Sequence, residues 1–166
     1  MSSLDLYSPR YVEKQLDKFR NRHNNHFGNH IRLAKGLVAK YGLQPPAILL
    51  DIGCSIGTFA LEFALDGYST IGLDLDAKAL YAGRKLAQEL GCSPRWFCAD
   101  AGDFSLEEKV DIAICFDLFE HLDDSTIARM LLCIRNNLRD NGILVFHTFP
   151  AEYNHFFIST SCHVFL

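Results

Sequence analysis

The strongest constraint on the fold is a segment in which an apolar run leads through a carboxylate into two glycines. Residues 48–52 are apolar except for Asp51, Gly53 and Gly57 follow four residues apart, and helical periodicity begins at Thr58. This order predicts a buried strand, a tight turn and the start of a helix. The free N–H groups of the first helical turn would face whatever lies above the loop. We therefore expect this unit to bind a ligand.

A second acid follows the next expected strand. Residues 69–73 form a β-favouring run that ends at Asp74, which lies 21 residues after Gly53. A carboxylate at this position can accept hydrogen bonds from both hydroxyls of a ribose. The spacing fits a dinucleotide or an adenosyl cofactor. It does not match the dinucleotide pattern G-x-G-x-x-G, because Ser55 and Thr58 stand where its second and third glycines would be.

The combined pattern is similar to that of a known enzyme family. Asp51-x-Gly53-x-Ser55-x-Gly57, then Asp74, then Asp100-Ala101, resembles the class I S-adenosylmethionine-dependent methyltransferases. The resemblance covers about residues 48–149 and departs from the family at Ser55, where glycine is usual. It implies S-adenosylmethionine as the cofactor, with S-adenosylhomocysteine as its product.

The resemblance also implies a role for individual residues. Asp74 would hold the ribose, Asp100 the adenine and Asp51 the ammonium group, while Leu75 and Phe116 would flank the adenine or the sulfur. A helix cap or loop carboxylate is the alternative for each aspartate. The expected cofactor-binding residues are Asp51, Gly53, Cys54, Ser55, Gly57, Asp74, Leu75, Asp100, Ala101 and Phe116.

The run E-H-L-x-D at residues 120–124 resembles the small-molecule enzymes of that family. We therefore expect methyl transfer to an oxygen, nitrogen or carbon of a small molecule. There are two alternatives. One is a methyltransferase that acts on RNA or protein, and the other is a cofactor-binding or interaction domain without turnover. His121 is the candidate catalytic base and His147 a second candidate.

Three further histidines, His23, His26 and His30, would share one face of an unbroken helix. Metal binding and substrate contact are possible readings of that spacing. We interpret these residues as ordinary solvated side chains, because Asn24 and Asn25 interrupt the helical pattern. The six cysteines contain no C-x-x-C pair, so we expect free thiols, no metal site and a reducing, cytoplasmic location.

Strand and helix patterns alternate along the chain. This predicts an α/β fold: a Rossmann-like, doubly wound, mainly parallel sheet with helices on both faces. An N-terminal helical arm, 1–44, is expected to belong to the same domain as the cofactor-binding core, 45–166, and to act as a lid. Ser8-Pro9 predicts a helix start, Asn141-Gly142 a turn before the fifth strand at 143–147, and Ser105-x-x-Glu108 a short turn or helix.

The carboxyl end is expected to hold only short or cut-off strands, with fragments at 156–158 and 163–166. The fifth strand would then expose its edge, which could pair two copies of the chain as a homodimer. The net charge is −4, yet residues 1–40 hold eight Lys and Arg against three Asp and Glu. This arm could attract nucleic acid, although a solvated helical face is the simpler interpretation. No apolar run has the length of a membrane span.

Overall fold

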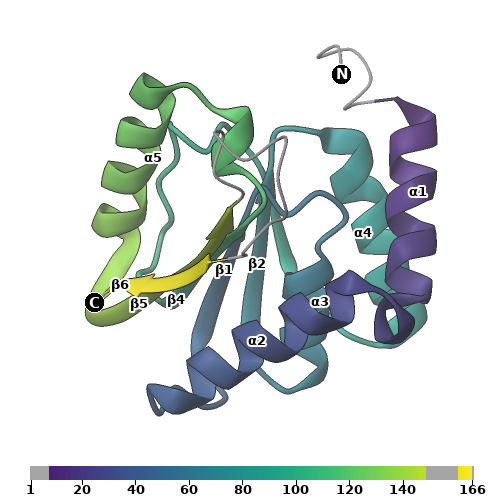
Figure 1. The fold of residues 1–166 in the computed structure, drawn as a ribbon, viewed down its shortest axis with the longest axis horizontal. Helices are drawn as coiled ribbons and strands as arrows, with labels where there is room; N and C mark the ends of the chain where they lie inside the picture. Colours follow the sequence, from purple (N-terminus) through teal and green to yellow (C-terminus); the bar gives the residue numbers. More distant parts are fainter. Residues whose placement is uncertain (1–7, 149–160, 166) are drawn as a thin grey trace.

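The computed structural model describes residues 8–148 and the backbone of 161–165. Six strands form one sheet in the order β3-β2-β1-β4-β5-β6 (Figure 1). β1 to β5 run parallel, and β6 pairs antiparallel with β5. The strands are β1 (Ile48–Ile52), β2 (Ser69–Asp74), β3 (Arg95–Cys98), β4 (Val110–Phe116), β5 (Leu138–Thr148) and β6 (Ser161–Phe165).

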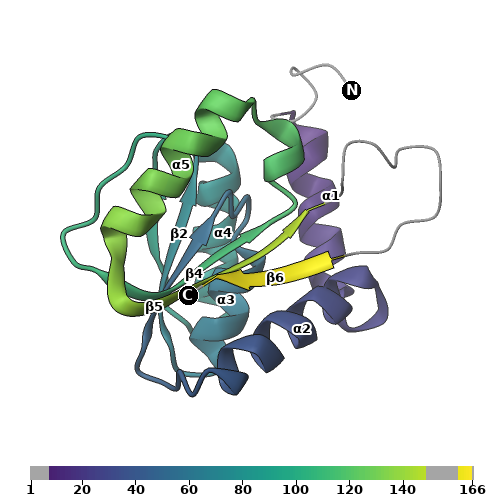
Figure 2. The same ribbon diagram turned by 60° about the vertical axis from the view of Figure 1, so that its left-hand side comes forward.

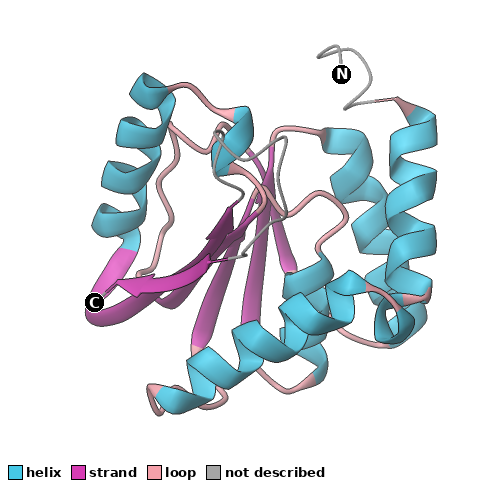
Figure 3. Cartoon of the chain, viewed as in Figure 1, coloured by secondary structure: helices cyan, strands magenta, loops and turns pink. Residues whose placement is uncertain are grey.

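Five α-helices surround this sheet in the described ranges, as the secondary-structure colouring of Figure 3 shows. Figures 1 and 2 place α5 on one face and α2, α3 and α4 on the other, with α1 packed outside α4. The predicted Rossmann-like α/β fold is therefore confirmed. The helices are α1 (Pro9–Arg20), α2 (His26–Lys40), α3 (Thr58–Leu65), α4 (Ala77–Leu90) and α5 (Asp124–Asn137).

The helix ends follow their local sequence. Ser8 accepts a hydrogen bond from the Tyr11 N–H and caps α1, with proline at the first helical position. Asp76 caps α4 by accepting from the Lys78 N–H, and Gly91 ends that helix at φ 71°. Asn25 caps α2, which separates His23 from the helix that carries the other two histidines.

The two faces of the sheet bury different side chains. Ile112, Ile114 and Phe116 of β4 point to the face that α2 and α3 cover, together with Ala34 and Val38 of α2, which are fully buried. Met130 and Ile134 of α5 cover the opposite face. Because α2 contributes to the central core, the amino-terminal segment is not a loosely attached arm along its whole length.

Three expectations at the carboxyl half of the fold were wrong. Asn141-Gly142 makes no separate turn, because β5 begins at Leu138 and the register shifts between its pairings with Val110 and Ile112. Residues 105–108 form neither a helix nor a hydrogen-bonded turn. β5 is not an exposed edge, since β6 pairs with it, so the reason for expecting a homodimer there is removed. The expected fragment at 156–158 lies outside the described residues.

Candidate functional site

The loop between β1 and α3 turns sharply beneath the carboxyl ends of the strands. Gly53, Ser55 and Gly57 all have positive φ, at 67°, 52° and 81°. The Gly57 N–H donates to the Cys54 carbonyl oxygen at 2.7 Å, which closes the turn immediately before α3. The backbone at Ser55 lies in the left-handed region, which strains serine but not glycine. This conformation explains why glycine is usual at this position.

The two glycines are needed for different reasons. A Cβ on Gly53 would lie 2.8 Å from Leu118 Cδ2, because the loop after β4 lies against this turn. A Cβ on Gly57 would lie 2.4 Å from the ring of Trp96 on β3. Gly83 of α4 meets the same ring, so the indole occupies a space that small residues leave open. Gly57 therefore makes room for Trp96, in addition to allowing the helix to begin.

Asp74 at the end of β2 connects the loop to the second strand. Its Oδ2 accepts from the Ser55 N–H at 2.7 Å and its Oδ1 from the Asp76 N–H at 2.8 Å. Burial raises the pKa of this carboxyl, although the hydrogen bonds from the two amides oppose the increase. Each carboxylate oxygen can accept more than one hydrogen bond, so Asp74 retains capacity for a ligand hydroxyl.

Asp51 lies deeper than the other predicted residues. It is 2% exposed, and its Oδ2 accepts from the Ala60 N–H at 3.0 Å. It points toward α3 because alternate side chains of β1 face that helix. Burial raises the pKa of Asp51 to about 7. Its observed partner is thus the first turn of α3, as for a helix-capping carboxylate, and its contact with a cofactor ammonium stays a prediction.

The expected adenine end is more open. Asp100 is exposed and accepts from the Gly102 N–H at 2.7 Å, and Ala101 is half-buried. Leu75 is 58% exposed, whereas Phe116 is buried against Phe59, with ring centroids 4.5 Å apart. Leu75 follows β2 at the surface, whereas Phe116 belongs to the core between the sheet and α2. Their predicted role of flanking the adenine or the sulfur stays a prediction.

One cavity of about 120 Å³ opens over the glycine loop. It brings together the predicted residues Gly53, Ser55, Asp74 and His121. It also includes residues that the sequence did not single out: Tyr11, Asp76, Ala79, Asp117 and Leu118. Asp117 has a positive φ of 55°, like Ser55, and both lie on this cavity. Strained backbone of this kind concentrates at functional sites.

The other predicted residues do not line this cavity. Cys54 is buried, and its N–H donates to the Leu73 carbonyl oxygen at 3.0 Å, so it holds the loop against β2. Position alone could have indicated Asp117 and Leu118, because they follow β4 at the same edge of the sheet. Nothing in the local pattern indicated Tyr11, which is brought there by the packing of α1 on α4.

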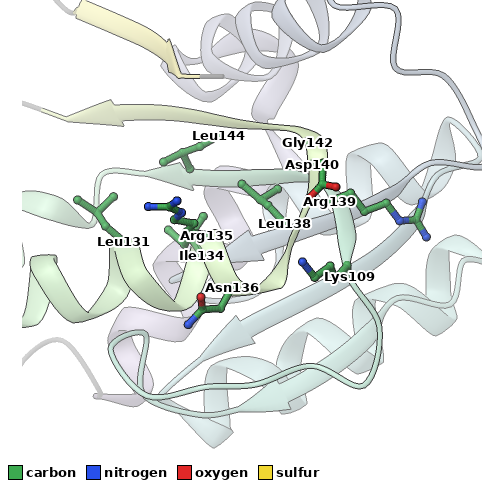
Figure 4. Close-up of a pocket in the computed structure, with 10 residues that line it drawn as sticks. All are labelled: Lys109, Leu131, Ile134, Arg135, Asn136, Leu138, Arg139, Asp140, Gly142 and Leu144. Carbon is green, nitrogen blue, oxygen red and sulfur yellow. The ribbon is translucent and has the colours of Figure 1, made fainter.

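A separate cavity, of about 680 Å³, lies away from the glycine loop, beside the end of α5 and the start of β5 (Figure 4). Three cationic side chains line it: Lys109, Arg135 and Arg139. Arg139 pairs with Asp111 at 2.7 Å, and Leu131 of α5 is 41% exposed. This cavity contains none of the predicted site residues.

The comparisons with known proteins identify the class of the domain. A family model described as a methyltransferase domain matches residues 49–142, which is more than half of the chain. The chain therefore belongs to the methyltransferase domain family. None of the described helices has the length and apolar character needed to cross a membrane.

Two relatives give the range of similarity. The chain is 25% identical over 150 residues to a ubiquinone biosynthesis O-methyltransferase of Rickettsia prowazekii, covering 82% of this chain and 59% of that protein. It is 23% identical over 162 residues to the enzyme of the same name from Rickettsia canadensis, covering 89% of this chain and 65% of that protein. The chain thus spans less than two thirds of the length of these relatives.

Solved structures share the fold. An S-adenosylmethionine-dependent methyltransferase from Clostridium acetobutylicum superposes with a TM-score of 0.75 at 16% identity, over 88% of this chain and 60% of that one. A magnesium protoporphyrin IX methyltransferase from Synechocystis, with bound cofactor, gives 0.68 at 18% identity, over 92% of this chain and 78% of that one.

Proposed function

We propose that this chain is an S-adenosylmethionine-dependent methyltransferase that acts on a small-molecule nucleophile. The observation that carries the proposal is the arrangement of Gly53, Ser55 and Asp74 around one cavity at the carboxyl edge of the sheet, in a chain of the methyltransferase domain family. The names of the relatives, which are O-methyltransferases of ubiquinone biosynthesis, support a small acceptor.

The residues present fit an adenosyl cofactor. Gly53 and Gly57 themselves add no side chain to the loop, Asp74 keeps acceptor capacity for the ribose, and Asp100 with Ala101 lies just after β3, where the adenine is expected. When bound, S-adenosylmethionine supplies a methyl group on a sulfonium, which is activated without further protein chemistry. The protein then has to align the acceptor with that methyl group and exclude water.

The size of the cavity implies a movement. Small-molecule sites are typically about 300–1,000 Å³, whereas the cavity over the glycine loop is about 120 Å³. Tyr11 on α1 and Leu118 after β4 form part of its wall. We propose that α1, rather than the whole segment 1–44, is the lid, because α2 belongs to the central core.

The acceptor site lies beside the same loop. His121 lines the cavity with an exposed side chain, so it can reach an acceptor hydroxyl and take its proton where the nucleophile needs a base. Nucleic acid is disfavoured as the substrate, because two cations of the amino-terminal segment are neutralised within the protein. Arg22 pairs with Glu62 of α3, and Lys35 pairs with both Glu62 and Asp66.

Calorimetry tests the proposal directly. We expect S-adenosylmethionine and S-adenosylhomocysteine to bind with a stoichiometry of about one, and NAD not to bind. Mass spectrometry of a panel of phenols, catechols and amines incubated with the cofactor then identifies the acceptor class. Preferential binding of NAD would overturn the proposal, and cofactor binding without any methyl transfer would favour a domain without turnover.

A further inference from the structure

Three polar side chains that no local motif connects meet beneath α2. His30 comes from α2, Asp117 follows β4, and His147 lies near the end of β5. One ligand-type atom of each lies within 4.8 Å of the others. Both imidazoles turn Nδ1 toward the same carboxylate: His147 Nδ1 is 2.5 Å from Asp117 Oδ1, and His30 Nδ1 is 3.9 Å from Asp117 Oδ2.

The burial of this cluster is unusual for polar groups. His147 is fully buried and His30 is 9% exposed. Nδ1 of His30 is buried and makes no hydrogen bond within residues 8–148, although a buried polar atom normally has a partner. The expectation that His30 is an ordinary solvated residue is therefore wrong, whereas His23 and His26 are exposed.

The surroundings hold the three side chains in place. The His30 and His147 rings have centroids 4.4 Å apart, and the Phe116 ring stacks on His147 at 5.6 Å. The Asp117 N–H donates to the His147 carbonyl oxygen at 2.9 Å, which holds Asp117 at its positive φ beside β5. Asp117 also lines the cavity over the glycine loop, so an ion would have a route in from solvent.

We propose that His30, Asp117 and His147 form a binding site for a divalent transition-metal ion, which would tie α2 to the ends of β4 and β5. This differs from our expectation from the sequence, which was that the chain has no metal site. Imidazole and carboxylate ligands in this ratio suit Zn²⁺, Fe²⁺ and Co²⁺. Three protein ligands leave a tetrahedral ion one position for water or another small ligand.

The two distances to the Asp117 carboxylate need only small adjustments, and the ligand atoms of the two histidines, which lie within 4.8 Å of each other, would also have to reach the spacing of a tetrahedral ion. With metal–ligand bonds of about 2.0–2.2 Å, neighbouring ligands of a tetrahedral ion are about 3.4 Å apart. His147 Nδ1 and the Asp117 carboxylate would have to separate by roughly 1 Å. His30 Nδ1 would have to approach that carboxylate by roughly 0.5 Å. The ion would satisfy His30 Nδ1, which the hydrogen bond between Asp117 and His147 leaves without a partner in the described chain.

Metal titration tests the site without any cofactor or substrate, so its result is independent of the proposed methyl transfer. Protein without a histidine tag is treated with EDTA, dialysed, and titrated with Zn²⁺ by calorimetry and with Co²⁺ by visible absorption. We expect one ion per chain and the absorption bands of cobalt with nitrogen and oxygen ligands. His30→Ala and Asp117→Asn should each weaken binding roughly 100-fold or more, because loss of a mere outer-shell partner already costs 10–100-fold.

Two matched variants serve as controls. His26→Ala removes an exposed histidine one turn earlier on the same helix, and His121→Ala removes the exposed histidine of the loop after β4. Both should bind the ion as tightly as the original chain. The proposal is overturned if the original chain binds no ion, if both His30→Ala and Asp117→Asn bind normally, or if His121→Ala abolishes binding while His30→Ala does not. Should His30→Ala fail to fold, Asp117→Asn, which preserves shape, decides the question.

Discussion

Replacing Asp74 separates its role in binding from its role in the fold. In the structure both carboxylate oxygens accept backbone N–H groups, from Ser55 and Asp76. The helix-cap alternative that the sequence offered for Asp74 was wrong, because Asp76 caps α4.

Asp74→Ala should therefore affect two quantities. Two half-buried amides lose their acceptor, and water can replace it only in part, so the free energy of unfolding should fall by about 1–2 kcal/mol. If the same carboxylate holds the ribose hydroxyls, affinity for S-adenosylhomocysteine should fall by roughly 2–4 kcal/mol, or about thirty- to several-hundred-fold. Urea unfolding of the ligand-free protein and calorimetry of the ligand measure the two effects separately.

Asp123→Ala is the matched control. Asp123 caps α5 by accepting from the Thr126 N–H at 2.8 Å, and it does not line the cavity. This substitution removes the same kind of bond, so it should lower stability but leave affinity unchanged. Near-normal ligand affinity in folded Asp74→Ala would refute the placement of the ribose. A loss of affinity in Asp123→Ala would show that general destabilisation, not a lost contact, explains both results.

Three other predictions follow from the same geometry. Ser55→Gly should raise stability by about 0.5–1 kcal/mol in urea unfolding, because glycine relieves the left-handed backbone at φ 52°; a lower stability would contradict this. The folded-state pKa of Asp51, about 7, exceeds the ordinary value of 3.8, so its contribution to stability is fully present below about pH 4 and is lost as the pH rises to 7. Asp51→Asn should flatten that decline in melting temperature, and equal declines in both proteins would show that this carboxyl does not titrate there. In hydrogen exchange, α1 should exchange faster than α2 without ligand and slow when cofactor is added; equal protection of both helices without ligand would rule out α1 as the lid.

The local elements were predictable because their signals are local. The strand, turn and helix around Gly53 and Gly57 depend on residues a few positions apart, as do the caps at Ser8 and Asp76. Alternation of such elements is enough to predict a parallel sheet with its loops at one edge. The position of Asp74 beside the glycine loop therefore follows from the order of the elements alone.

Tertiary structure decided which way the side chains face and which distant residues meet. Asp51 points into the core toward α3, and Phe116 packs under α2, because successive side chains of a strand alternate between faces and the helices determine which face is buried. β5 extends back to Leu138 through a register shift that no turn signal predicts.

The cluster of His30, Asp117 and His147 shows this limit most clearly. These residues lie on α2, after β4 and on β5, and only the crossover connections of the sheet bring them within 4.8 Å. The histidine spacing in the sequence grouped His30 with His23 and His26, which are exposed, and gave no sign of Asp117 or His147. The sequence alone determined the elements and the glycine loop. The packing of α2 on the sheet determined this cluster, because a pattern of near neighbours carries no information on contacts between segments far apart in the chain.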